Sequence, residues 1–267
     1  MRHAESLGRA STEDGALLEW ASAGSGEPVV LIAGQAVTRR SWDDLVPRLA
    51  ALFRVITFDQ RGIGESTEGD EPPRTTREFA GDVLAVLGSA GVAKAHVIGH
   101  SMGGRVAQWL AIDEPDVVGS LVLIAATGGN ERGAPRSPEA TRDLADWDAA
   151  RLAPRFFTDA YLAAHPSAMD LFVRMEGSPR ARRRAFDASA AHDAWDQLSS
   201  VRSPTLVVHG TDDSITPVEN GRALAQAIPG AQYLEIPGGR HALHLDDPRA
   251  IDAIVGHMLR HPLPPAG

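Results

Sequence analysis

Two patterns of apolar and polar residues alternate along this chain. Short, nearly unbroken apolar runs have the length and composition of buried strands, and several of the longer stretches between them have apolar residues at helical spacing. Strands that alternate with helices in this way predict a mostly parallel sheet with helices on both faces. The predicted strands cover residues 16–21, 29–33, 54–58, 95–98, 121–125, 205–209 and 231–236.

Polar residues mark where the first helices should begin. Ser41 is placed to cap a helix that continues to about residue 52. Thr75 and Glu78 have the spacing of a capping box, which predicts a helix to about residue 90. A third helix is predicted over residues 102–113, directly after a strand.

The alternation stops after residue 127. No strand-like run occurs over residues 128–199, where short helices are predicted at 142–151, 158–164, 168–175 and 182–191. We therefore expect an α/β core formed by residues 1–127 and 200–267, interrupted by a helical insertion over residues 128–199.

The motif G-x-S-x-G spans residues 99–103, between a predicted strand and a predicted helix. In this context the serine, Ser101, occupies a sharp turn that exposes its Oγ at the helix N-terminus. Free N–H groups and the helix dipole favour developing negative charge there. Glycine is expected on both sides because a Cβ would strike the neighbouring backbone and because a positive φ is cheap only for glycine. Ser101 is therefore a candidate nucleophile.

Candidates for a base and an acid follow two later strands. Asp212 and Asp213 come after the strand at 205–209, and His241 and His244 come after the strand that ends at residue 236. All of them lie past the carboxyl ends of strands, where open α/β sheets place their ligands. Either aspartate and either histidine could complete a catalytic triad with the serine.

Four motifs in this order resemble the α/β-hydrolase superfamily along nearly the whole chain. They are the serine motif, the D-x-R-G-x-G-x-S turn over 59–66, the H-G-x-x-D-x-x-x-P turn over 209–217 and the histidine loop over 239–241. The resemblance implies an α/β-hydrolase fold, with Ser101 as nucleophile, Asp213 as acid and His241 as base. Asp59 and Arg61 are expected to fix a turn.

One motif departs from the family pattern. The family often has His-Gly-x after the strand that precedes the first helix, whereas residues 33–35 are Ala-Gly-Gln. The missing histidine changes the hydrogen bonding of this loop. The oxyanion donor is a backbone N–H, so any side chain can occupy the third position. By resemblance, Gln35 and Met102 supply the two oxyanion donors.

The helical insertion resembles the cap of the family, which roofs the active site and excludes water. The arginines at 180 and 182–184 are expected to form a solvated helix face, with recruitment of an anion as the alternative. Apolar residues of the insertion are candidates to line the substrate pocket or to form the core of the cap: Trp147, Phe156, Phe157, Met169, Phe172, Met175 and Trp195.

Composition narrows the function classes. A formal net charge of −9 disfavours nucleic acid as a partner, and the absence of cysteine excludes disulfides and thiolate metal sites. No apolar run approaches the ~18 residues of a transmembrane helix, and the start of the chain lacks an apolar signal region. We expect a cytoplasmic monomer or homodimer that needs no metal or cofactor and does not bind a membrane.

The residues after the serine motif resemble those of enol-lactonases and small carboxylesterases. This resemblance implies a serine hydrolase that cleaves a small-molecule ester or lactone through an acyl-enzyme. Three alternatives keep the same triad: a C–C bond hydrolase, a cofactor-free perhydrolase, and a ligand-binding signalling protein with slow turnover.

Overall fold

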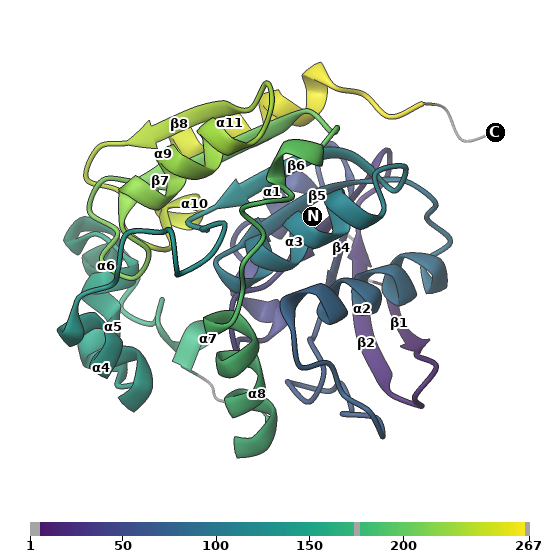
Figure 1. Cartoon of the computed structure of the whole chain (residues 1–267), viewed down its shortest axis with the longest axis horizontal. Coiled ribbons are helices and arrows are strands. Elements are labelled where there is room, and N and C mark those ends of the chain that lie inside the picture. Colours follow the sequence, from purple (N-terminus) through teal and green to yellow (C-terminus); the bar gives the residue numbers. More distant parts are fainter. Residues whose placement is uncertain (1–5, 174–176, 265–267) are drawn as a thin grey trace.

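The computed structural model, which describes residues 6–173 and 177–264, contains one eight-stranded sheet (Figure 1). The strand order is β1-β2-β4-β3-β5-β6-β7-β8. The pairs β1–β2 and β2–β4 are antiparallel, and the other pairs are parallel, as the sequence predicts. The strands are β1 Ser6–Ser11, β2 Leu17–Ala23, β3 Pro28–Ile32, β4 Arg54–Phe58, β5 Ala95–His100, β6 Val118–Ile124, β7 Thr205–Gly210 and β8 Gln232–Ile236.

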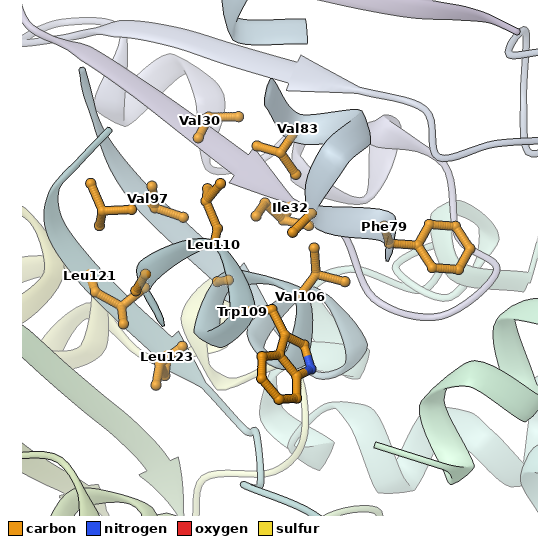
Figure 2. Close-up of a cluster of buried hydrophobic side chains, with 14 of the residues drawn as sticks. Val30, Ile32, Phe79, Val83, Val97, Val106, Trp109, Leu110, Leu121 and Leu123 are labelled. Carbon is orange, nitrogen blue, oxygen red and sulfur yellow. The ribbon is translucent and has the colours of Figure 1, made fainter. Parts of the chain in front are cut away.

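Helices cover both faces of the sheet, because alternate strand residues point to opposite sides. Val30 and Ile32 of β3 join one buried cluster, whereas Val29 and Leu31 join a second. The helices are α1 Val46–Leu49, α2 Thr76–Ser89, α3 Met102–Asp113, α9 Val218–Ala227 and α11 Pro248–Arg260. Residues of α2, α3 and α9 belong to the first cluster, and Figure 2 shows side chains of α2 and α3 against the sheet. Residues of α1 and α11 belong to the second, so each face has its own core.

The chain between β3 and β4 does not form the single helix predicted from Ser41. It forms the 3₁₀ helix η1 Arg39–Trp42 and the four-residue α1 instead, and Ser41 lies inside η1. Pro47 explains the difference, because a proline inside a helix removes an N–H and clashes with the preceding turn. In the structure Pro47 occupies the first turn of α1, where it is tolerated.

The apolar pattern predicts strands β2 to β8 but not β1. Ala10 is the one buried residue of β1, which lies at the edge of the sheet and pairs with β2. A half-exposed edge strand leaves no apolar run in the sequence. At α2, Thr75 and Glu78 form the predicted capping box.

Among the described residues, five α-helices lie between β6 and β7. The predicted helix at 142–151 is wrong as a single element, because Trp147 takes a left-handed φ of 51°. Asp148 then caps a new helix by accepting from two N–H groups, those of Ala150 and Arg151. The five are α4 Pro138–Asp146, α5 Ala149–Phe156, α6 Asp159–Ala164, α7 Asp170–Val173 and α8 Pro179–Ala190. The 3₁₀ helix η2 Leu198–Ser200 and the short α10 Leu243–Asp246 complete the elements.

The helices α4 to α8 gather along the lower left and bottom of Figure 1. Backbone bonds join this group to the loop after β8. The N–H groups of His241 and Ala242 donate to the carbonyls of Arg155 and Phe156 at 3.2 and 2.8 Å. These two bonds therefore attach the loop that carries His241 to the helical segment between β6 and β7. None of the described helices is long and apolar enough to cross a membrane.

Candidate active site

Ser101 lies between β5 and α3 with φ 55° and ψ −117°. A positive φ strains a residue with a Cβ and persists only where the surroundings enforce it. The N–H of Ser101 donates to the carbonyl of Ile124 at 2.9 Å. A Cβ at Gly99 would collide with the carbonyl of Gly103, and one at Gly103 with the carbonyl of Ile32. Close backbone approach explains both glycines. The expectation that they need a positive φ is wrong, because Ser101 itself takes that conformation.

Asp213 follows β7, and hydrogen-bond donors surround its carboxylate. Oδ1 accepts from the N–H groups of Ile215 and Thr216, both at 2.8 Å. Oδ2 lies 2.9 Å from Nδ1 of His241 and 3.5 Å from Nε2 of His209. Burial raises the pKa of this carboxyl. The charge of His241 and the hydrogen bonds from His209 and His241 together outweigh burial and hold the pKa below its usual range. Asp213 is therefore ionised at neutral pH.

His241 lies between β8 and α10, and its side chain is 2% exposed. A carboxylate only accepts hydrogen bonds, so the 2.9 Å contact with Asp213 requires the hydrogen on Nδ1. In the neutral ring Nε2 then carries the lone pair that a general base needs. The ring also contacts Phe156 edge-on, with centroids 5.1 Å apart. Both the tautomer and the orientation of His241 are thus fixed by its neighbours.

The two competing residues have other surroundings. Asp212 is exposed, and its Oδ1 accepts from the hydroxyl of the preceding threonine at 2.8 Å. His244 is buried, with its ring centroid 4.5 Å from that of His100. Burial, and to a smaller extent the charge of His241, lowers the pKa of His244 to about 3, so this ring is neutral. Of the two aspartates and two histidines considered above, Asp213 and His241 form the bonded pair.

His100 supports the loop of His241. Its Nε2 donates to the carbonyl of His241 at 3.0 Å. Burial, followed by the charges of His244 and His241, holds the pKa of His100 well below its usual range. Although three histidine rings gather here, no set of three or more His, Asp or Glu side chains within the described ranges could hold a metal ion.

Gln35 lies in the loop after β3, and Met102 begins α3. Within residues 6–173 and 177–264, neither backbone N–H has a hydrogen-bond acceptor. Gln60 stabilises the loop that lacks the family histidine, because its Nε2 donates to the carbonyl of Ala33 at 2.9 Å. Gln35 and Ser101 line the same cavity. Two free N–H donors are thus available next to the candidate nucleophile.

Ser101 and His241 line a cavity of about 30 Å³. That volume accommodates roughly one water molecule, whereas ligand pockets are usually several hundred Å³. A second cavity of about 270 Å³ shares five lining residues with the first, namely Gln35, Arg105, Arg136, Ser189 and Ile215. The two cavities therefore lie next to each other.

The apolar residues predicted to line a pocket divide into two groups. Phe157 and Met169 are buried in the cluster that includes α1 and α11, and Trp195 packs against the other cluster. Met175 lies outside the described residues. The smaller cavity is lined by the remaining three, Trp147, Phe156 and Phe172.

The sequence motifs give no indication of two arginines at these cavities. Arg105 of α3 is 6% exposed, and Arg136 precedes α4 and is half-buried. In the arginine cluster of α8 that the sequence does indicate, Arg184 pairs with Glu68. A cation on α3, where nearly every other residue is buried, is the signal that could have identified Arg105.

Comparisons with known proteins identify the family of the chain. The chain matches the family described as alpha/beta hydrolase fold over residues 27–248. It is 34% identical over 246 residues to a candidate non-heme bromoperoxidase, BpoC, from Mycobacterium tuberculosis H37Rv, which covers 86% of this chain and 92% of that protein.

Two solved structures are similar over nearly their whole length. An esterase, RhEst1, from Rhodococcus sp. ECU1013 is 27% identical with a TM-score of 0.84, covering 96% of this chain and 100% of that one. The enol-lactonase from Burkholderia xenovorans LB400 is 27% identical with a TM-score of 0.76, covering 94% and 99%. From the family match, the sheet and the strand-end site together, the chain belongs to the α/β-hydrolase fold family.

Proposed function

We propose that this chain is a serine hydrolase that cleaves carboxylic esters or lactones through an acyl-enzyme. The observation that carries the proposal is the buried Asp213–His241 pair at 2.9 Å, whose histidine lines the same cavity as Ser101. The strained φ of Ser101 adds support, because such strain is concentrated at functional sites. The esterase and the enol-lactonase among the similar structures favour these two substrate classes.

In the acylation step, Oγ of Ser101 attacks the carbonyl carbon while Nε2 of His241 takes the hydroxyl proton. The carbonyl electrons move to oxygen and form a tetrahedral oxyanion. The intermediate then collapses, the C–O bond to the leaving group breaks, and His241 returns the proton to the departing alkoxide. Asp213 keeps the ring oriented and stabilises the imidazolium with its negative charge.

The free N–H groups of Gln35 and Met102 meet the oxyanion in this mechanism. Donors that are already oriented stabilise the charge without reorganising during the reaction, and each contributes about 3 kcal/mol to the transition state. Gln60 would act as a positioning residue for this loop through its bond to the carbonyl of Ala33.

Hydrolysis of the acyl-enzyme completes the cycle. A water molecule gives its proton to His241 and attacks the acyl carbon, and the proton then returns to Oγ of Ser101 as the acid leaves. We propose that the helical segment over 128–199 acts as a cap in this step. Its residues Trp147, Phe156 and Phe172 line the small cavity and would keep bulk water out.

Steady-state kinetics on 4-nitrophenyl acetate, 4-nitrophenyl butyrate and a small set of lactones test the proposal. We expect many turnovers per enzyme molecule, and a loss on the order of 10⁵ in kcat for a folded Ser101→Ala variant. A single slow turnover would favour a ligand-binding signalling protein instead. If the folded Ser101→Ala variant kept more than about a tenth of the wild-type activity, Ser101 would not be the nucleophile.

Perhydrolysis is a second candidate, because a relative with 34% identity is named as a candidate non-heme bromoperoxidase. Hydrogen peroxide would replace water and attack the acyl-enzyme, releasing a peracid and free Ser101. Adding peroxide to the ester assay and measuring peracid tests this candidate. Peracid formation faster than acid formation would favour perhydrolysis, and unchanged acid formation would favour hydrolysis.

A further inference from the structure

Arg105 is a buried cation about one helical turn after the candidate nucleophile Ser101. It lies on α3, four residues after Ser101, which places the two residues on the same side of the helix. Its Nη1 donates to the carbonyl of Ser189, and its Nη2 lies 3.5 Å from Oδ1 of Asn130. Both partners are neutral, and they use two of the five N–H donors of the guanidinium.

Arg136 is a second cation at the same place. Its Nε donates to the carbonyl of Ile215 at 2.6 Å, again a neutral partner. Arg105 and Arg136 both line the small cavity of Ser101 and the larger cavity next to it. Two positive charges therefore border the space that the body of a substrate would occupy.

Neither guanidinium forms an ion pair with a carboxylate of the described residues. Burial, and then the charge of Arg136, lowers the pKa of Arg105 to about 10, so Arg105 remains charged at neutral pH. Burial also lowers the pKa of Arg136, and the charge of Asp213 opposes this. Asp213 itself is already bonded to His241. A buried charge without a counter-ion is unfavourable, and the nearby charge of the half-buried Arg136 adds to this cost at Arg105.

We propose that Arg105 and Arg136 bind a carboxylate of the substrate, so that the enzyme prefers an ester or lactone that carries a second, free carboxylate. This inference rests on the proposed function and names its substrate class. A guanidinium binds the two oxygens of a carboxylate through parallel N–H groups, and the bound anion would supply the counter-charge that the described residues do not provide. The arginine pair would thereby position the ester carbonyl over Ser101.

Matched pairs of 4-nitrophenyl esters test the preference. Mono-esters of dicarboxylic acids from succinate to adipate are compared with neutral acyl esters of equal length, and Ser101→Ala supplies the background rate. For the best-fitting length, we expect kcat/KM to be about 10- to 100-fold higher for the carboxylate ester, as for a charged hydrogen-bonded contact. Equal rates for the two members of every pair would overturn the proposal and leave the hydrolase assignment intact.

Variants of the two arginines separate binding from structure. In Arg105→Met and Arg136→Met we expect the carboxylate-to-neutral ratio to fall towards one, mainly through KM. Arg105→Lys should retain part of the preference because it keeps the charge. The exposed Arg222, which pairs with Glu235 on the surface, supplies the control Arg222→Met with an unchanged ratio. A loss of rate that is equal for both esters would show a structural role and contradict the proposal.

A binding measurement makes the test independent of turnover. Glutarate or adipate should raise the melting temperature of the wild type, and the shift should vanish in the Arg105→Met and Arg136→Met variants. Inorganic phosphate serves as the competing anion. A larger shift with phosphate than with either dicarboxylate would contradict a carboxylate site. If no ester were hydrolysed but the dicarboxylate shift depended on both arginines, the proposed function would fail and the anion site would stand.

Discussion

The two walls of the Ser101 cavity differ in whether their charged side chains have partners of opposite charge. On the wall formed by the strand ends, the carboxylate of Asp213 meets His241, His209 and two backbone N–H groups. On the second wall, Arg105 and Arg136 meet neutral oxygens, and no carboxylate of the described chain pairs with either. The charged groups of the first wall are paired within the protein, whereas among the described residues no anion pairs with the two cations of the second.

Another buried arginine, Arg61, pairs with carboxylates of the protein. Arg61 is 8% exposed and pairs with both Asp82 and Asp14. Its Nε also donates to the two carboxylate oxygens of Asp82 at 2.8 and 3.0 Å. Arg61 therefore has carboxylate counter-ions, whereas Arg105, which is buried to a similar degree, has only neutral partners among the described residues. The contrast supports the proposal that Arg105, together with Arg136, binds an anionic ligand.

The largest effect is expected on the first wall, from His241. His241→Ala removes the base and should lower kcat by about 10⁵ to 10⁶. His244→Gln should lower kcat by less than about tenfold, because the ring of His244 packs beside His100 and makes no contact with the proton path. Steady-state kinetics on one aryl ester, with circular dichroism as the folding control, compare the two. Reversed losses would assign the base to His244.

The next effect distinguishes the neighbouring aspartates. Asp213→Asn should lower kcat by about 10⁴, because an amide cannot stabilise the imidazolium or hold the productive tautomer. Asp212→Asn, at an exposed site, should cost less than about tenfold. The same aryl-ester assay measures both variants. Equal losses would mean that the 2.9 Å contact between Asp213 and His241 has no special part in catalysis.

Stability measurements sharpen the comparison between the arginines. Arg61→Met leaves Asp82 buried without its cation and should reduce the free energy of unfolding by about 3–5 kcal/mol. Arg105→Met gives up bonds to neutral acceptors but also removes an uncompensated charge, so we expect a change within about 1 kcal/mol. Urea unfolding at pH 7 gives both values. A greater loss for Arg105→Met would identify Arg105 as a structural residue.

The smallest effect is a dependence of stability on pH. Burial, and then the charge of Arg105, lowers the pKa of His192 to about 3, against 6.5 for an ordinary histidine. The folded ring stays neutral while the unfolded chain takes up a proton. The contribution of His192 to stability is therefore complete above pH 6.5 and is lost as the pH falls from 6.5 towards 3.

Urea unfolding at pH 7, 6 and 5 measures this slope. His192 should contribute up to about 1.4 kcal/mol per pH unit below its ordinary pKa, and His192→Gln should remove that part of the slope. The exposed His165 supplies the control His165→Gln. An identical slope in the wild type and in His192→Gln would contradict a buried neutral ring at His192.

Local patterns predicted most of the sheet and the strand-end wall. The apolar runs mark β2 to β8, and the capping box marks α2, because each signal lies within a few consecutive residues. Predictions failed where the deciding feature was a single residue: Pro47, in the first turn of α1, is incompatible with one continuous helix from Ser41, and Trp147 divides the helix expected at 142–151. The edge strand β1 leaves no apolar run to find.

The second wall could not be predicted, because it depends on which partners are missing in space. Arg105 follows the serine motif by two residues, yet only the structure places Ser189, Asn130 and Arg136 around it. The hydrogen bond that supports the oxyanion loop could not be predicted either. Sequence comparison identifies a missing histidine, whereas the bond from Gln60 to Ala33 joins residues 27 positions apart.

The most direct test of the central claim, that Ser101 is the activated nucleophile of this site, is covalent labelling followed by mass spectrometry. The wild type is incubated with an organophosphonate directed at reactive serines, and the intact mass and the peptide masses are measured. We predict the addition of one phosphonyl group, located on Ser101, and a much slower addition in Asp213→Asn and His241→Ala. An unlabelled wild type, or a label on any other serine, would contradict the claim.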